Sequence, residues 1–146
     1  MVFGSIGNFF SNTFSNLKDR ASQFFGNPAN IASLAKTAKQ WLGGEYHAPG
    51  GYNYCGPGTQ LKGQKAINGA DSACEVHDYE YEAFAKNKDK VSKKDLTRMI
   101  RESDNKLINS IENSGVDDLG SELSKLGIKA KMKLEDFGLL DPMKFI

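Results

Sequence analysis

The stretch Asp71-Ser72-Ala73-Cys74-Glu75-Val76-His77-Asp78-Tyr79-Glu80-Tyr81 decides the fold of this chain. Its periodicity predicts a helix over residues 71–86, because its core-type side chains recur at helical spacing and share one face. His77 falls in the middle of that face, which also carries Ala73, Cys74, Tyr81 and Phe84. The side chain of Asp78 points about a quarter turn away from that of His77, toward the edge of this buried face.

A second helix is predicted over residues 93–112, opened by Ser92 and Asp95 in an arrangement resembling a capping box. Its apolar face is interrupted by Asp104 and otherwise consists of Leu96, Ile100, Leu107 and Ile111. An unpaired buried carboxylate costs several kcal/mol, so Asp104 needs a partner. The short connection between the two helices makes them antiparallel neighbours, with His77 and Asp104 at similar heights.

We therefore expect His77 and Asp104 to form a hydrogen bond. A carboxylate that holds one imidazole nitrogen leaves the other free to take a proton from water, as in a general base with an orienting partner. The alternative is a structural pair that joins two helices. Periodicity alone leaves both interpretations open.

Before the first helix, residues 45–69 are rich in glycine and proline and are predicted to form an irregular loop. The segment Tyr54-Cys55-Gly56-Pro57-Gly58 allows backbone carbonyls to converge, and calcium binds carbonyl and carboxylate oxygens together. Such a segment is more often an ordinary turn. A bridge between Cys55 and Cys74 would fasten the loop to the helix, whereas two unpaired buried thiols are the alternative.

The rest of the chain limits the function less sharply. A net charge of +1 gives no support to a nucleic-acid partner. The start does not read as a signal peptide, and no stretch has the roughly 20 apolar residues that span a bilayer. A phenylalanine stripe between Phe3 and Phe24 predicts an amphipathic helix that either inserts into lipid or packs on the domain's own core or on a partner. Asn27-Pro28 begins a second predicted helix. A last pattern of apolar residues at helical spacing predicts a C-terminal helix. Its members are Leu119, Leu123, Leu126, Ala130, Leu134 and Phe137.

At the residues quoted above, the sequence resembles the phospholipase A2 superfamily, and in particular the domain found in parvovirus capsid proteins and related viral proteins. Residues 54–58 are similar to the family's Tyr-x-Gly-x-Gly calcium loop, and residues 71–81 to its active-site helix. Asp104 falls where the family places the carboxylate that pairs with the catalytic histidine. The resemblance covers roughly residues 50–111, and its cysteine pair matches a bridge of the secreted enzymes.

The resemblance implies a catalytic set of His77, Asp104, Tyr81 and Gly56. His77 would deprotonate water, Asp104 would orient His77, Tyr81 would hydrogen-bond to Asp104, and the Gly56 N–H would donate to the oxyanion. The cofactor would be Ca²⁺, bound by the backbone carbonyls of three loop residues and by one carboxylate. These ligands are Tyr54, Gly56, Gly58 and Asp78, and the implied disulfide joins Cys55 to Cys74.

The fold expected from these patterns is all-α, with two antiparallel catalytic helices, a calcium loop and helical extensions at both ends. We place the N-terminal helices at 1–44, the core at 45–112 with its loop at 52–61, and the C-terminal extension at 113–146. The expected function is hydrolysis of the sn-2 ester of membrane glycerophospholipids by a virion-associated enzyme acting on the endosomal membrane, with a viral capsid as a further partner. The alternatives are a catalytically silent membrane-disrupting module and a structural capsid element.

Overall fold

The computed structural model describes residues 45–56 and 58–146. Within these residues three helices follow one another, α3 (Gly69–Asn87), α4 (Lys93–Asn113) and α5 (Leu119–Asp136), and a short 3-10 turn, η1 (Pro142–Phe145), comes after them. No β-strand occurs in this part of the chain, so the all-α prediction is confirmed. The helices predicted within residues 1–44, and Pro57 of the loop, lie outside the described residues.

The starts of α3 and α4 are set by polar capping side chains. The side chain of Asn68 accepts a hydrogen bond from the backbone N–H of Asp71 at 2.9 Å. This cap starts α3 at Gly69, two residues before the predicted start, because it satisfies a backbone N–H that would otherwise lack a partner. Ser92 accepts from the N–H of Asp95 at 3.1 Å, so α4 begins where the capping pattern predicts.

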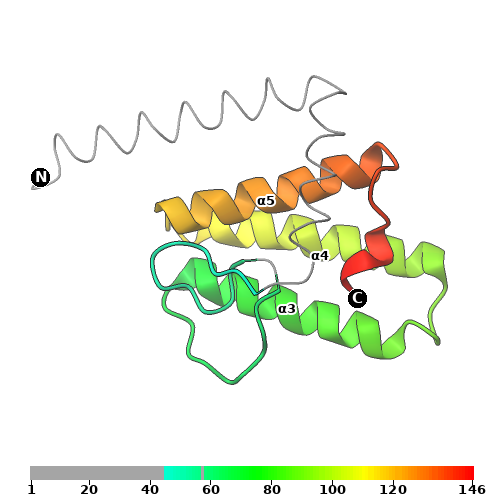
Figure 1. Cartoon of the computed structure of the whole chain (residues 1–146), viewed down its shortest axis with the longest axis horizontal. Helices are drawn as coiled ribbons and strands as arrows, with labels where there is room; N and C mark the ends of the chain where they lie inside the picture. The colour runs from blue at the N-terminus through cyan, green and yellow to red at the C-terminus, as the bar shows by residue number, and fades with distance from the viewer. Residues whose placement is uncertain (1–44, 57) are drawn as a thin grey trace, which may run out of the picture.

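The helices α3 and α4 lie side by side and run in opposite directions, and α5 packs on α4 (Figure 1). Two apolar clusters stabilise this arrangement. One is at the loop end of the helices and includes Tyr52, Tyr54, Cys74, Leu107 and Ile111. The other lies toward the α3–α4 connection and consists of Phe84, Leu96 and Ile100, with Met143 of η1 and Ile146 packed against it.

Between these two clusters along α3 and α4 lie His77 and Asp104, both buried, with 8% and 0% of their surface exposed. The predicted buried faces of the two helices are therefore confirmed, including His77 and Asp104, except that Tyr81 is only partly buried. Burial of a carboxylate at this depth is tolerated only when its charge is compensated and its oxygens are hydrogen-bonded. The fold thus places a polar layer inside an otherwise apolar interface.

The buried side of α5 is not the face marked by the apolar pattern in the sequence. Of the predicted apolar face only Leu134 is buried, whereas Leu119, Leu123 and Phe137 are 38%, 38% and 52% exposed. The buried side of α5 instead carries small and charged residues, namely Gly120, Ser121, Glu122, Lys125 and Lys131. The leucine spacing was misleading because ion pairs and a close loop contact, rather than leucine burial, determine how α5 sits. None of the described helices combines the length and apolarity that crossing a bilayer requires.

Candidate active site

The glycine-rich loop before α3 is fastened to that helix by the carboxylate of Asp71, which is fully buried. One oxygen accepts the backbone N–H groups of Tyr54 and Cys55 at 2.8 and 3.2 Å. The other accepts those of Asn53 and Ile67, both at 3.1 Å. Four donors on one carboxylate fix the path of the loop, because each would otherwise be a backbone N–H without its bond.

A disulfide joins Cys55 to Cys74, so the loop is also tied covalently to α3 one turn before His77. This is the pairing that the family resemblance implies, and unpaired thiols are excluded. The next residue, Gly56, has a φ of +133°, and a Cβ there would lie 1.9 Å from the backbone oxygen of Tyr46. Only glycine fits this position without moving the chain.

A third attachment joins the loop to α5. The hydroxyl of Tyr52 donates to Asp118, the capping residue of α5, at 2.7 Å. The two segments approach so closely that a Cβ on Gly120 would lie 2.3 Å from the Tyr52 ring. The loop is therefore held between the start of α3 and the start of α5.

His77 and Asp104 form the predicted pair. Nε2 of His77 lies 2.8 Å from Oδ1 of Asp104, and the hydroxyl of Tyr81 donates to the same oxygen. A carboxylate only accepts, so Nε2 carries the proton and the lone pair is on Nδ1. Nδ1 lies 4.0 Å from Oδ1 of Asp78, beyond hydrogen-bonding distance. The free nitrogen of His77 is therefore on the side of Asp78.

Opposing effects set the protonation of these groups. Burial lowers the pKa of His77, but the hydrogen bond with Asp104 and the nearby Asp78 raise it, and the net shift is upward. Burial alone would raise the pKa of Asp104, yet His77, Lys131 and Tyr81 together hold it below its usual value. Asp104 is thus a carboxylate near neutral pH. The pKa of Tyr81 is raised, chiefly by burial and then by Asp104, so Tyr81 remains a donor.

Asp78 and the carbonyl of Tyr54 converge on a single hydroxyl. Oγ1 of Thr59 lies 2.8 Å from the Tyr54 oxygen and 2.9 Å from Oδ2 of Asp78. A carbonyl and a carboxylate brought together in this way suit calcium, which prefers several hard oxygen ligands. Within the described residues no three His, Cys, Asp or Glu side chains gather, so a cation here would rely on backbone or other neutral oxygens beside Asp78.

The other two predicted ligands, Gly56 and Gly58, lie in the same loop. Both have positive φ values, +133° and +75°, a conformation that side chains disfavour. The donor set of the loop and Asp78, carbonyl and carboxylate oxygens, therefore fits a calcium ion in chemistry. All the predicted site residues thus belong to the loop, α3 or α4 around His77.

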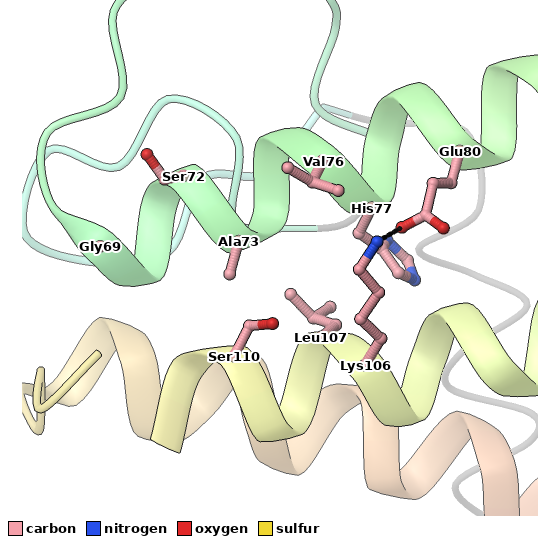
Figure 2. A pocket seen from close by; sticks show the side chains of 9 residues that line it. All are labelled: Gly69, Ser72, Ala73, Val76, His77, Glu80, Lys106, Leu107 and Ser110. Carbon is pink, nitrogen blue, oxygen red and sulfur yellow. Dashed lines mark hydrogen bonds and ion pairs between the residues drawn. The ribbon is translucent and has the colours of Figure 1, made fainter. Parts of the chain in front are cut away.

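Beside His77, a groove of about 190 Å³ runs between α3 and α4. Ala73, Val76 and Leu107 give it apolar walls (Figure 2). At the end occupied by His77, the amine of Lys106 donates to Glu80 at 3.3 Å, and this ion pair links the two helices. The groove thus offers apolar surface next to a histidine and a cation at its rim.

Three residues at the site were missed by the sequence analysis. Asp71 was read only as the start of a helix, although its carboxylate holds the loop. Thr59 gave no signal, since its role depends on where the loop returns. Lys131 donates to Oδ2 of Asp104 at 2.7 Å, and it gave no signal either, because a lysine on a helix is ordinarily solvated.

The site is of the phospholipase A2 type. It pairs a histidine with a carboxylate across antiparallel helices, and a disulfide-anchored glycine loop and a second carboxylate lie beside that pair. A family model described as "Phospholipase A2-like domain" matches residues 44–131, more than half of the chain, and the protein belongs to this family. The match continues beyond the predicted core as far as Lys131. Comparison with curated proteins and with solved structures gave no match.

Proposed function

We propose that the protein is a calcium-dependent phospholipase A2 that hydrolyses the sn-2 ester of glycerophospholipids. The observation that carries this proposal is the pairing of His77 Nε2 with Asp104 at 2.8 Å, which leaves Nδ1 free on the side of Asp78. A structural pair needs only the Nε2 contact. A free nitrogen beside a candidate cation site and an apolar groove is the arrangement that a water-activating base needs.

In this mechanism Nδ1 of His77 accepts a proton from a water molecule as the water oxygen attacks the ester carbonyl carbon. Asp104 holds the Nε2–H, keeps the productive tautomer and stabilises the imidazolium that forms. The N–H of Gly56 donates to the carbonyl oxygen as negative charge develops there. His77 then returns the proton to the leaving glycerol oxygen, which gives a fatty acid and a lysophospholipid.

The carbonyls of Tyr54, Gly56 and Gly58 and the carboxylate of Asp78 would hold calcium. When bound there, calcium supplies a Lewis acid for the ester carbonyl oxygen. Burial raises the pKa of Asp78, and the neighbouring His77 and Thr59 offset part of that effect. Deprotonation of Asp78 is therefore part of calcium binding, as it is for carboxylate ligands in general.

The apolar walls of the groove support a lipid substrate, and the position of Lys106 at the His77 end suits the phosphate of its head group. The ion pair with Glu80 is half exposed, so a phosphate can replace the carboxylate on Lys106 at little cost. As part of the same proposal, the biological setting is a virus particle that uses the enzyme to penetrate the endosomal membrane.

The test is release of fatty acid from phosphatidylcholine vesicles with a labelled sn-2 chain, in calcium and in excess chelator. We expect release by the wild type in calcium only, and a loss of about 10²- to 10⁴-fold in His77→Gln, as for removal of a general base. Glu82→Gln, which changes a half-exposed carboxylate on the same helix, should retain activity.

Release that survives both chelation and the His77→Gln substitution would contradict the mechanism. Leakage of vesicle contents without any release of fatty acid would instead support a membrane-disrupting module. The absence of both from folded protein would leave the structural role.

A further inference from the structure

Lys131 is a buried lysine that reaches the reaction centre from α5. Its amine lies 2.7 Å from Oδ2 of Asp104 and 2.7 Å from Oε2 of Glu135, and only 8% of the residue is exposed. A lysine is seldom buried to this extent unless its charge is compensated. Here two carboxylates provide that compensation.

The contact of Lys131 with Asp104 differs from that of His77. Oδ1 of Asp104 accepts from His77 and Tyr81, whereas Oδ2 accepts from Lys131. Among the described residues, Lys131 is the only hydrogen-bond donor found for Oδ2. Both oxygens of the carboxylate are thus held, and Asp104 cannot turn about its side-chain bond without losing a bond in a fully buried place.

Lys131 is itself fixed by its neighbours. Oε1 of Glu135 lies 3.4 Å from the guanidinium of Arg101, which also donates to Asp136 at 2.8 Å. The Lys131 amine lies 5.5 Å from the centre of the Tyr81 ring, within the range of a cation–π contact. Lys131 is therefore held by Glu135 and by the Tyr81 ring as well as by Asp104, as a group that positions another must be.

The charge balance of the site also requires Lys131. While His77 is neutral and ready to accept a proton, the negative charge of Asp104 has no cation on α3 to compensate it. Lys131 provides that cation from α5, in a region where an uncompensated charge is costly. The resting form of the His77–Asp104 pair thus needs a third charged group, and the geometry identifies which one it is.

We propose that Lys131 is a positioning residue for the reaction, acting through Asp104 to hold the His77 ring with Nδ1 toward the attacking water. This inference rests on the proposed phospholipase activity. It makes α5 part of the active site, whereas the sequence analysis treated that segment as an extension.

The test compares Lys131→Met, which keeps length and removes charge, with Lys131→Arg, which keeps charge. The matched control is Lys125→Met, since Lys125 is an equally buried lysine on α5 whose amine pairs with Glu122 at 3.0 Å, away from Asp104. The substrate is a short-chain phosphatidylcholine below its micellar concentration, so that binding to an interface does not enter the rates. Calcium affinity and thermal unfolding are measured for each variant.

We expect Lys131→Met to lower kcat by roughly 10- to 100-fold, as loss of an outer orienting partner does, with KM and calcium affinity unchanged. Lys131→Arg should restore most of kcat, and Lys125→Met should leave it unchanged. An unchanged kcat in folded Lys131→Met, or an equal loss in Lys125→Met, would overturn the proposal.

A second measurement does not depend on activity or on the folding of the methionine variant. In calcium-free protein, the Nε2–H proton of His77 should give a downfield NMR signal protected from exchange with water by its bond to Asp104. Lys131→Gln, a milder change, should broaden that signal, whereas Lys125→Gln should not. Unchanged signals in both variants would refute the positioning role. If the wild type does not hydrolyse phospholipid but Lys131→Gln still broadens the signal, only the proposed activity is refuted.

Discussion

Nε2 of His77 lies 2.8 Å from Oδ1 of Asp104, a hydrogen bond between two helices at positions 27 residues apart. The bond occupies a buried layer with an apolar cluster on either side, so water cannot readily replace either partner. It also fixes which imidazole nitrogen is protonated. The proposed chemistry depends on that choice, because only the other nitrogen is on the side of Asp78.

The two acidic residues next to His77 should have separable roles. Asp104→Asn should lower kcat by about 10³- to 10⁴-fold, because an amide there can present its N–H₂ group to the ring and favour the wrong tautomer. Its calcium affinity should equal that of the wild type. Asp78→Asn should abolish both turnover and calcium binding, measured by isothermal titration calorimetry.

The control for both substitutions is Asp89→Asn, an exposed carboxylate in the α3–α4 connection that should change neither quantity. Equal loss of calcium affinity in the two active-site variants would show that Asp78 and Asp104 do not have the separate roles assigned to them.

The sequence predicted the centre of the fold well because its signals are local. Helical spacing placed Leu96, Ile100 and Asp104 on one face, and the short connection made α3 and α4 antiparallel. The His77–Asp104 contact therefore followed from the apolar spacing in each helix and from the length of the loop that connects them. The start of a helix could also be predicted where the sequence contains a recognisable capping residue, as Ser92 is for α4.

What could not be predicted depends on contacts between segments far apart in the chain. The leucines of α5 suggested an apolar face, but the observed face is set by Lys131 on Asp104 and by Gly120 against Tyr52. A buried ion pair leaves no periodic pattern, because a lysine at a helix surface is ordinarily solvated. Thr59 likewise acquires its partners only when the loop returns to α3.

Substitution of Asp71 should destabilise the loop strongly. Asp71→Asn replaces one acceptor oxygen by a donor that faces two backbone N–H groups, so at least two buried bonds are lost. We expect the free energy of unfolding to fall by about 3 kcal/mol or more, measured by urea denaturation, and calcium affinity to weaken. Asp95→Asn, at an exposed position of α4, is the comparison. A loss of less than about 1 kcal/mol would mean that the loop does not depend on this carboxylate.

Reduction of the Cys55–Cys74 disulfide should lower stability without disrupting α3 and α4. The bridge spans 19 residues, and a closure of this size contributes roughly 3 kcal/mol, mainly by restricting the unfolded chain. We expect a lower melting temperature in reductant and weaker calcium binding, because the loop loses one of its attachments. The Cys55→Ala/Cys74→Ala variant should melt at a temperature that reductant does not change. Identical melting of the wild type with and without reductant would show that no bridge forms in solution.

The raised pKa of His77 predicts a pH-dependent contribution to stability. Because the folded protein binds this proton more tightly than the unfolded chain, the contribution is fully present below the unfolded value of about 6.5. It is lost as the pH rises through the higher pKa of the folded state. The free energy of unfolding of the wild type relative to His77→Gln should therefore be largest near pH 5.5 and decline to a constant at alkaline pH. Both proteins are measured without calcium, since a cation held by Asp78 would offset the carboxylate that helps to raise the pKa.

An NMR titration of the imidazole signals gives the same quantity directly, and the signal missing from His77→Gln identifies His77. A midpoint above 6.5 is expected, because Asp104 and Asp78 together outweigh burial. A midpoint below 6.5, with a stability difference that grows as the pH rises, would mean that burial dominates. Asp104 would then compensate the imidazolium too weakly to stabilise it during the reaction.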